Sequence, residues 1–368
     1  MAILMMKKFT SIEFILCALL LICAFQAQPT KAQTPQTDKP NSQADKPSPE
    51  KAPGNRATID PKKFALIISG VGGEEIYSKK FYSQAVQLYE GLTNKLGFDE
   101  KRVFLLTESV ISNSENMANG NFARATADEA RKAFAAIKSA ATPDSLIFIA
   151  LIGHGSFDSQ EAKFNLVGPD LIAKDYAALI NGLPTRRVVF INCASASGEF
   201  VKPLSSPDRL IISATRSGNE QNVTIFAEFF IKGLTESAAD TDKNGRTSLL
   251  EAFNYATKLT ADWYKQKGRL ATEHALLDDN GDGAGHEKEE SGDGAIAKTT
   301  YLDSKTMAEA SADAEVIKWL EDKQQLEIDI EKLKARKSDM KIEEYETELE
   351  RLLVELAKTN RRIKARKK

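Results

Sequence analysis

The sequence predicts an α/β fold, in which a mainly parallel central sheet is enclosed between two layers of helices. Short apolar runs alternate along the chain with segments of helical periodicity. Two of these runs, residues 146–152 and 188–191, contain no polar side chain, which is typical of strands buried on both faces of a parallel sheet. Each of them ends in small or turn-forming residues. Successive strand-helix-strand units imply right-handed crossovers and an α/β/α sandwich of about 200 residues.

The elements of this sandwich follow one another in a regular order. Apolar runs predict five strands, and spacings of three and four between apolar residues predict the intervening helices. The strands are expected over residues 64–68, 103–106, 146–152, 188–191 and 210–213, and the helices over residues 81–96, 126–140, 174–180 and 226–234. Residues 69–73 form a glycine-rich loop after the first strand, where unusual backbone angles are expected.

The N-terminal segment has the pattern of a signal peptide over residues 1–32. Lysines precede an apolar run over residues 14–25, and Thr30 and Ala32 are small residues at the spacing of a cleavage site. Cleavage there predicts a secreted or periplasmic protein that begins at Gln33 and has no membrane association. An uncleaved anchor is the alternative, although the run is short for a bilayer span of about 20 residues. Lipidation of Cys23 is a further alternative, with Ile22 a poor neighbour for it.

Removal of that segment leaves one cysteine, Cys193, of the three in the chain. Exported proteins usually pair their cysteines in disulfides, so a single thiol calls for a reason. Residues 33–60 are rich in Pro, Gln, Ser and Lys and are predicted to be a disordered linker. The net charge of −2 is small and mixed, which gives no support for nucleic-acid binding.

Two reactive side chains stand at the ends of the two apolar runs. His154 follows the run 146–152, and Cys193 follows the run 188–191. In open α/β sheets ligands bind at the carboxyl edge of the strands, so these two side chains are expected to meet there. The imidazole would take the thiol proton and return it to a leaving amine, while the N–H groups of Gly155 and Cys193 stabilise the oxyanion. Taken alone, Cys193 would more commonly be a small buried hydrophobe.

Other chemistries find no support in the sequence. It has no GxSxG nucleophile elbow, no P-loop, and no GxGxxG after a strand. His274 and His286 lie in an acidic segment without paired ligand spacing and are expected to be exposed or incidental. No cofactor is expected for catalysis.

These residues resemble the caspase-like cysteine peptidases, and most of all the legumain family. The resemblance consists of an apolar strand ending in His154 and Gly155 and a second ending in Cys193, followed by Ser and Gly, and it covers residues 61–265. It implies a caspase-like fold, a Cys193/His154 dyad, and an oxyanion hole from Gly155 and Cys193. It also implies cleavage of a peptide or protein substrate after one selected P1 side chain, in a pocket built from residues 70–80 and 213–221.

The chain departs from the legumain pattern at several positions. Ala194 stands where legumains carry an acid, and the segment from Ser195 to Gly198 is longer than theirs. The first pocket loop lacks their P1-binding arginine and offers acidic side chains and two lysines instead. The candidate pocket residues are Glu74, Ser213, Arg216 and Glu220. A cationic floor would favour an acidic or amide P1 residue, whereas a glutamate floor would favour Arg or Lys.

A twelve-residue loop after the core matches a calcium-binding loop. Carboxylate, amide and hydroxyl oxygens, a glycine and a closing glutamate occupy the expected places, and Arg246 stands where the ligand is a backbone carbonyl. The predicted ligands of this structural Ca²⁺ are Asp240, Asp242, Asn244, Arg246, Ser248 and Glu251. A helix over residues 249–263 would follow. The alternative is a polar turn. Residues 278–283 repeat the opening of such a loop, with Glu287 or Glu289 as its only closing residues.

The C-terminal part is predicted to comprise an acidic linker, residues 266–313, and a coiled coil or helical hairpin, residues 314–368. The latter is dense in Glu, Lys, Leu and Arg, with apolar residues at heptad spacing and an interruption near Ser338. Self-association is the expected role, and covering the active site is an alternative. The function predicted is therefore an exported cysteine endopeptidase. The rival is a non-catalytic protein of the same fold that acts as a scaffold through its coiled coil.

Overall fold

The computed structural model describes residues 57–109, 120–287, 292–304 and 313–366. The predicted signal peptide, most of the N-terminal linker and Glu289 lie outside these ranges. No helix among the described residues combines the length and the apolar character needed to cross a membrane.

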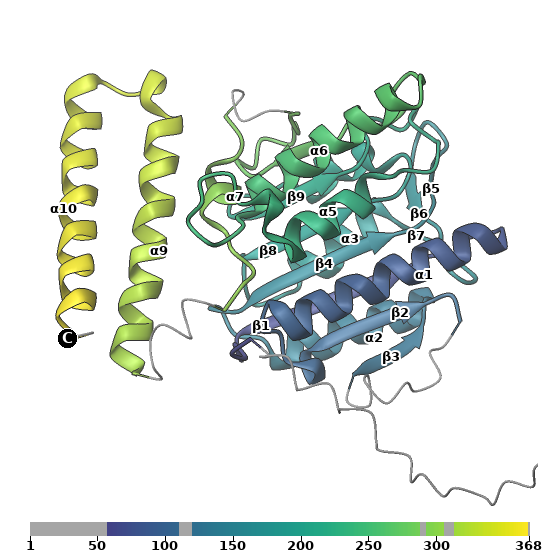
Figure 1. Cartoon of the computed structure of the whole chain (residues 1–368), viewed down its shortest axis with the longest axis horizontal. Coiled ribbons are helices and arrows are strands. Elements are labelled where there is room, and N and C mark those ends of the chain that lie inside the picture. The colour runs from purple at the N-terminus through teal and green to yellow at the C-terminus, as the bar shows by residue number, and fades with distance from the viewer. Residues whose placement is uncertain (1–56, 110–119, 288–291, 305–312, 367–368) are drawn as a thin grey trace, which may run out of the picture. The chain divides into compact units, whose positions relative to one another are not determined.

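A seven-stranded sheet forms the centre of the protein, in the order β10-β9-β8-β4-β1-β2-β3 (Figure 1). Its strands are β1 (Lys63–Ser69), β2 (Val103–Thr107), β3 (Asn121–Arg124), β4 (Leu146–Ile152), β8 (Val188–Asn192), β9 (Arg209–Ser213) and β10 (Leu276–Asp278). All neighbours pair in parallel except β10, which runs antiparallel to β9. The five predicted strands and the mainly parallel α/β class are confirmed, whereas β3 and β10 were not predicted.

Helices cover both faces of the sheet. One face packs against α1 (Glu75–Glu90), α5 (Phe226–Thr235) and α6 (Leu249–Gln266), which lie in front of the sheet in Figure 1. The other face packs against α2 (Ala127–Ala140), α3 (Ala173–Asn181) and the short α4 (Val201–Leu204). β4 is fully buried along its length because both faces are covered, which explains why its sequence is apolar at every position.

A small antiparallel sheet branches from the carboxyl end of β4. It comprises β5 (Gly155–Phe157), β6 (Ala162–Phe164) and β7 (Leu171–Ile172). Its strands have two or three residues each, so the sequence carried no periodicity from which to predict them. β5 begins at Gly155, immediately after His154, and thereby fixes the direction in which the chain leaves the central sheet.

The compact core extends beyond residue 265, the predicted domain boundary. β10 belongs to the central sheet, and α7 (Ala295–Thr299) leads to a segment, residues 302–304, that is bound at the start of β1. There the buried ammonium of Lys63 donates hydrogen bonds to Leu302 O at 2.8 Å and to Ser304 Oγ at 2.9 Å. Part of the predicted acidic linker is therefore structural.

The C-terminal helices form a hairpin. α9 (Ala314–Ala335) and α10 (Ile342–Arg366) are joined through a short 3-10 turn at Lys337–Asp339, close to the predicted interruption at Ser338. Apolar side chains from both helices make a small shared core: Leu326, Ile330, Leu333, Tyr345, Leu349, Leu352 and Leu356. The heptad residues are therefore satisfied within one chain, and a single long helix is not what forms.

Candidate active site

The parallel pairing of β4 with β8 brings His154 and Cys193 to the same edge of the sheet. Leu151 is aligned with Asn192, and the Cys193 N–H continues the ladder by donating to Leu151 O at 2.8 Å. Side chains of a strand alternate between faces, so Cys193 lies on the face of Ile191 and Val189. This is the face covered by α1 and α5, since these residues belong to the core cluster of those helices.

His154 lies on that same face, held by helix α1. Its ring makes edge contacts with Tyr77 and Phe81, whose ring centroids are 5.3 Å and 5.0 Å away. Its Nε2 is 3.1 Å from the carbonyl oxygen of Gly72. A carbonyl can only accept, so Nε2 carries the proton and donates it, and Nδ1 holds the lone pair of the neutral imidazole. The hydrogen bond to the loop that follows β1 therefore leaves Nδ1 as the nitrogen that can act as the base.

Cys193 is a free, buried cysteine, with the residue only 5% exposed. Burial raises the pKa of this thiol, and the carboxylate of Glu273 raises it further. Both effects oppose the thiolate that a nucleophile must become. A nucleophilic role for Cys193 therefore requires a base that takes the proton of this thiol.

The two N–H groups predicted to form the oxyanion hole are engaged within the chain. That of Cys193 bonds to Leu151 O, as described above, and that of Gly155 donates to Ser195 Oγ at 3.2 Å. Ser195 Oγ in turn donates to Gly155 O at 3.1 Å. The first contact belongs to the sheet ladder, which sequence reasoning could not anticipate. The Gly155 N–H is bound by a side-chain hydroxyl, that of the buried Ser195, and not by the backbone of the sheet.

The loops after β8 and β9 are bound tightly together beside Cys193. Ala196 N donates to Glu220 O at 2.8 Å, and Gly198 N donates to Thr215 Oγ1 at 3.0 Å. Gly198 has to be glycine, because a Cβ there would meet the backbone carbon of Arg216 at 2.3 Å. The loop after β9, which was predicted to line the substrate pocket, is therefore held against the segment that follows the candidate nucleophile.

The four candidate pocket residues have different environments. Glu220 is nearly buried, and its carboxylate binds His274 Nδ1 at 2.5 Å and lies 3.4 Å from the guanidinium of Arg216, whose side chain is 55% exposed. Glu74 is exposed at the start of α1. Ser213 is fully buried and donates to Thr215 O at 2.8 Å, so it does not line an open pocket; the sequence could not show that its strand is covered on both faces.

The two remaining histidines are not incidental, contrary to expectation. His274 pairs with Glu220, and His286 Nδ1 lies 2.6 Å from the buried carboxylate of Asp293. Both acids come from segments distant in sequence or outside any recognisable motif, so no spacing indicated the pairs. Asp293 also closes the second acidic loop, because its carboxylate accepts hydrogen bonds from the N–H groups of Asp279 and Asn280.

The predicted calcium loop brings three of its carboxylates together. One oxygen from each of Asp240, Asp242 and Glu251 lies within 4.8 Å of the others. Gly245 has φ of +81°, which allows the sharp turn in the middle of the loop. Burial pushes the pKa of Glu251 upward, but hydrogen bonds from Ser248 and Thr241 hold it below its usual value. This donor set fits a hard divalent cation.

The side chains of the other predicted ligand residues make hydrogen bonds within the chain; for Arg246, the predicted ligand atom is the backbone carbonyl, which its side-chain contacts leave unaffected. Asn244 Oδ1 accepts from Arg246 N at 2.8 Å, and the Ser248 hydroxyl caps helix α6 in a reciprocal pair with Glu251. The side chain of Arg246 binds Asp303 at 2.9 Å and stacks on Tyr301. These contacts fasten the loop to the segment that precedes the hairpin.

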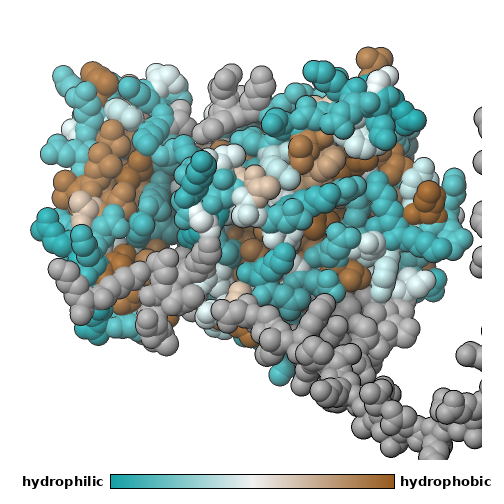
Figure 2. Space-filling view, in the orientation of Figure 1, coloured by the Kyte–Doolittle hydropathy of each residue, from teal (hydrophilic) through white to brown (hydrophobic). Residues whose placement is uncertain are grey.

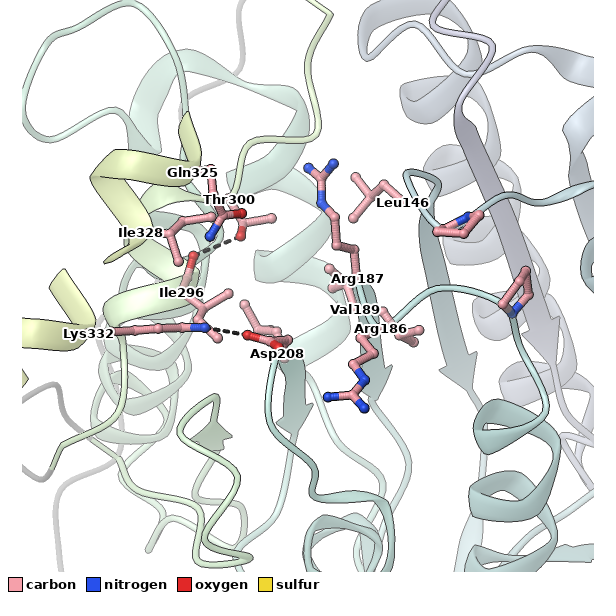
Figure 3. Close-up of a pocket in the computed structure, with 14 residues that line it drawn as sticks. Leu146, Arg186, Arg187, Val189, Asp208, Ile296, Thr300, Gln325, Ile328 and Lys332 are labelled. Atoms are coloured by element: carbon pink, nitrogen blue, oxygen red, sulfur yellow. Dashed lines mark hydrogen bonds and ion pairs between the residues drawn. The ribbon is translucent and has the colours of Figure 1, made fainter. Parts of the chain in front are cut away.

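The largest cavities described for this chain lie away from Cys193. One, of about 420 Å³, is lined by the amino-terminal ends of β8 and β9 together with α7 and α9, and Lys332 forms an ion pair with Asp208 at its edge (Figure 3). Strands present their amino ends there, opposite the edge that carries His154 and Cys193. This cavity is therefore separate from the candidate active site.

Comparisons with known proteins give only distant likenesses. No family model matches the chain, and no curated protein matches it. Among solved structures, the Drosophila initiator caspase Dronc is similar with a TM-score of 0.40 and 12% identity, covering 69% of this chain and 96% of that one. The protein GSU0716 of Geobacter sulfurreducens is similar with a TM-score of 0.37 and 13% identity, covering 59% of this chain and 93% of that one.

Proposed function

We propose that this chain is an exported, caspase-like cysteine endopeptidase, in which Cys193 is the nucleophile and His154 the general base. One observation carries the proposal. Neighbouring parallel strands deliver the thiol and the imidazole to one face of the same sheet edge, and the bond to Gly72 leaves Nδ1 of that imidazole free to accept a proton. A thiol and a base positioned in this way are the elements of nucleophilic acyl transfer.

Activation of the site requires two local changes. The Gly155 N–H has to exchange Ser195 Oγ for the carbonyl oxygen of the substrate, and the thiol has to transfer its proton to the imidazole. Charge that develops on the substrate oxygen would then be stabilised by this N–H. Peptide binding along the rim between residues 153–157 and 194–198 would supply the energy for the exchange, because an incoming carbonyl replaces the hydroxyl as acceptor.

We assign an acidic or amide side chain to the P1 position. Glu220 is closed off by Arg216 and His274, whereas the Arg216 guanidinium is more than half exposed at the loop that faces residues 196–198. Arg216 also lies 3.9 Å from the carboxylate of Glu287, but its side chain stays more than half exposed, and a cation beside an already paired carboxylate favours an anionic or polar partner over Arg or Lys. A legumain-like or caspase-like preference would be consistent with this arrangement.

The test is turnover of a peptide library randomised at P1, run on the mature protein and on Cys193→Ala side by side with Ca²⁺ and reductant. We expect cleavage after acidic or amide residues that is lost, by at least a thousandfold, in the variant, since residual rates without a nucleophile come only from binding and polarisation. If the parent protein cleaves no peptide, and thiol-reactive peptides do not label Cys193, the proposal is contradicted.

A non-catalytic scaffold is the second candidate, favoured by the buried thiol and by the exposed apolar surface of the hairpin. Ile342, Leu353 and Val354 of α10 are 56%, 48% and 43% exposed, and hydrophobic residues gather over the hairpin in Figure 2. Such a surface fits self-association of this segment. In that case Cys193→Ala would leave the biological phenotype unchanged, and deletion of residues 314–368 would abolish it.

We further propose that the loop 240–251 binds a structural Ca²⁺. Binding to the native state alone would raise the free energy of unfolding by about 2.7 kcal/mol at a hundredfold excess over Kd. Glu251→Gln, which removes one ligand charge, should lose most of this gain when melting is measured with Ca²⁺ and with chelator. Glu236→Gln, a change of charge just outside the loop, is the matched control. Equal melting of the parent with and without Ca²⁺ would show that the loop is only a turn.

A further inference from the structure

Glu273 is a buried carboxylate close to Cys193 that the proposed reaction does not use. The residue is 3% exposed, and it lies in the segment that connects α6 to β10. Its two oxygens accept hydrogen bonds from Ile225 N at 2.9 Å, from Phe226 N at 3.1 Å and from the hydroxyl of Tyr264 at 3.0 Å. It therefore sits at the N-terminus of α5 and satisfies N–H groups there that have no partner within the helix.

A chain of contacts links this carboxylate to the nucleophile. Thr224, which precedes the N–H groups bound by Glu273, donates its hydroxyl proton to the carbonyl oxygen of Cys193. Both Thr224 and Glu273 are buried, so these hydrogen bonds are shielded from bulk water. The backbone of Cys193 is thus held from the side of α5 by one hydroxyl, whose position depends on how the start of α5 is fixed.

The same assembly is tied to the helix that holds the base. Lys80 of α1 donates from Nζ to Thr224 O at 3.0 Å. The next residue of α1, Phe81, and Tyr77, three residues before Lys80, contact the ring of His154. A single helix therefore contacts the imidazole with two aromatic rings and reaches the segment that holds Cys193 with a lysine.

The opposite charges of Glu273 and Lys80 also support a link between these two residues. Burial lowers the pKa of Lys80, while the carboxylates of Glu273 and Glu228 act in the opposite direction. Burial raises the pKa of Glu273, and the N–H donors of α5 and the cation of Lys80 counteract it. Removal of the partly buried cation of Lys80 would leave the buried anion of Glu273 with less compensation.

We propose that Glu273 is a positioning residue for the Cys193/His154 pair. Through the start of α5 and Thr224 it fixes the backbone of Cys193, and through Lys80 it couples that backbone to α1 and so to His154. Glu273, from the segment before β10, is the charged group that acts on the thiol; Lys80 from α1 and Tyr264 from α6 in turn act on Glu273. The proposal rests on the proposed function for its kinetic consequences, but not for its effect on the thiol.

The first test measures alkylation of Cys193 by iodoacetamide against pH in the full mature chain, which requires no peptidase activity. Glu273→Gln keeps the shape and removes the negative charge, so the alkylation profile should move to lower pH by about one unit, a rate gain of about tenfold below the midpoint. Glu228→Gln is the matched control, because this exposed residue of α5 makes the same change of charge. Two controls identify alkylation that takes place only after the protein unfolds. These are the melting curve of each variant and the alkylation profile of the chain unfolded in urea.

The second test separates positioning from charge. Thr224→Val removes the hydroxyl that holds Cys193 and leaves every charge in place, so the alkylation profile should stay within about 0.3 pH units of the parent. We expect kcat to fall about tenfold and KM to stay within about twofold, because misplaced reacting groups lose orientation rather than binding. Superimposable alkylation profiles of Glu273→Gln and the parent, equal shifts for both Gln variants, or an unchanged kcat in Thr224→Val would overturn the proposal. If the parent turns over no peptide, the proposed function fails, and the alkylation profiles still decide the role of Glu273.

Discussion

Replacement of His154 by alanine should reduce kcat/KM for a peptide substrate by about a thousandfold. The imidazole is the general base in the proposed reaction, and such groups contribute roughly a hundred- to ten-thousandfold to the rate. Its replacement removes the Nδ1 lone pair that the bond from Nε2 to Gly72 O leaves available. The measurement is kcat/KM for the best library peptide under saturating Ca²⁺.

Tyr77→Phe provides the control for this substitution. It retains the ring that lies against His154, with a centroid separation of 5.3 Å in the parent, and removes only the hydroxyl. We expect its kcat/KM to stay within about threefold of the parent, because the ring contact and not the hydroxyl holds the imidazole. A His154→Ala protein that keeps more than a tenth of the parental turnover would remove His154 from the mechanism.

Gly155→Ala should reduce turnover by about a hundredfold or more without preventing folding. A Cβ at this position would meet the backbone oxygen of Ser195 at 2.4 Å, and a backbone atom cannot swing away as the end of a side chain can. The loop after β4 and the loop after β8 would have to separate by a sizeable fraction of an ångström. A displacement of about 1 Å between reacting groups can cost about a hundredfold in rate.

Gly182→Ala is the matched control for this second prediction. Gly182 follows α3 with φ of −78°, and the nearest atom to an added Cβ is 3.4 Å away, which is an ordinary contact. Turnover and melting temperature should both stay close to those of the parent. Gly155→Ala should lose kcat while its melting temperature falls by only a few degrees, since the strain is confined to the rim of the sheet. Full activity in Gly155→Ala would show that the two loops already separate during the reaction.

The sequence alone determined the class of the fold and the place of the two reactive residues. Five apolar runs and their helices were sufficient to predict the parallel sheet, because buried strands need apolar side chains on both faces and therefore leave a continuous signal. The expectation that His154 and Cys193 share one edge followed from chain direction alone, since parallel strands end together. Spacing alone also grouped Asp240, Asp242 and Glu251 as candidate calcium ligands, and one carboxylate oxygen of each lies within 4.8 Å of the others.

Only the tertiary structure decided what surrounds those residues. The loss of Ser213 as a pocket residue, the engaged N–H of Cys193, the pair between Glu220 and His274, and the position of Glu273 all depend on contacts between segments far apart in the chain. The periodicity of a sequence cannot predict such contacts, because it reflects only the local secondary structure of each segment and not which distant segment packs against it. Local sequence specifies which strand ends in a thiol; the packing of α1, α5 and β10 around it decides how buried that thiol is and which carboxylate it faces.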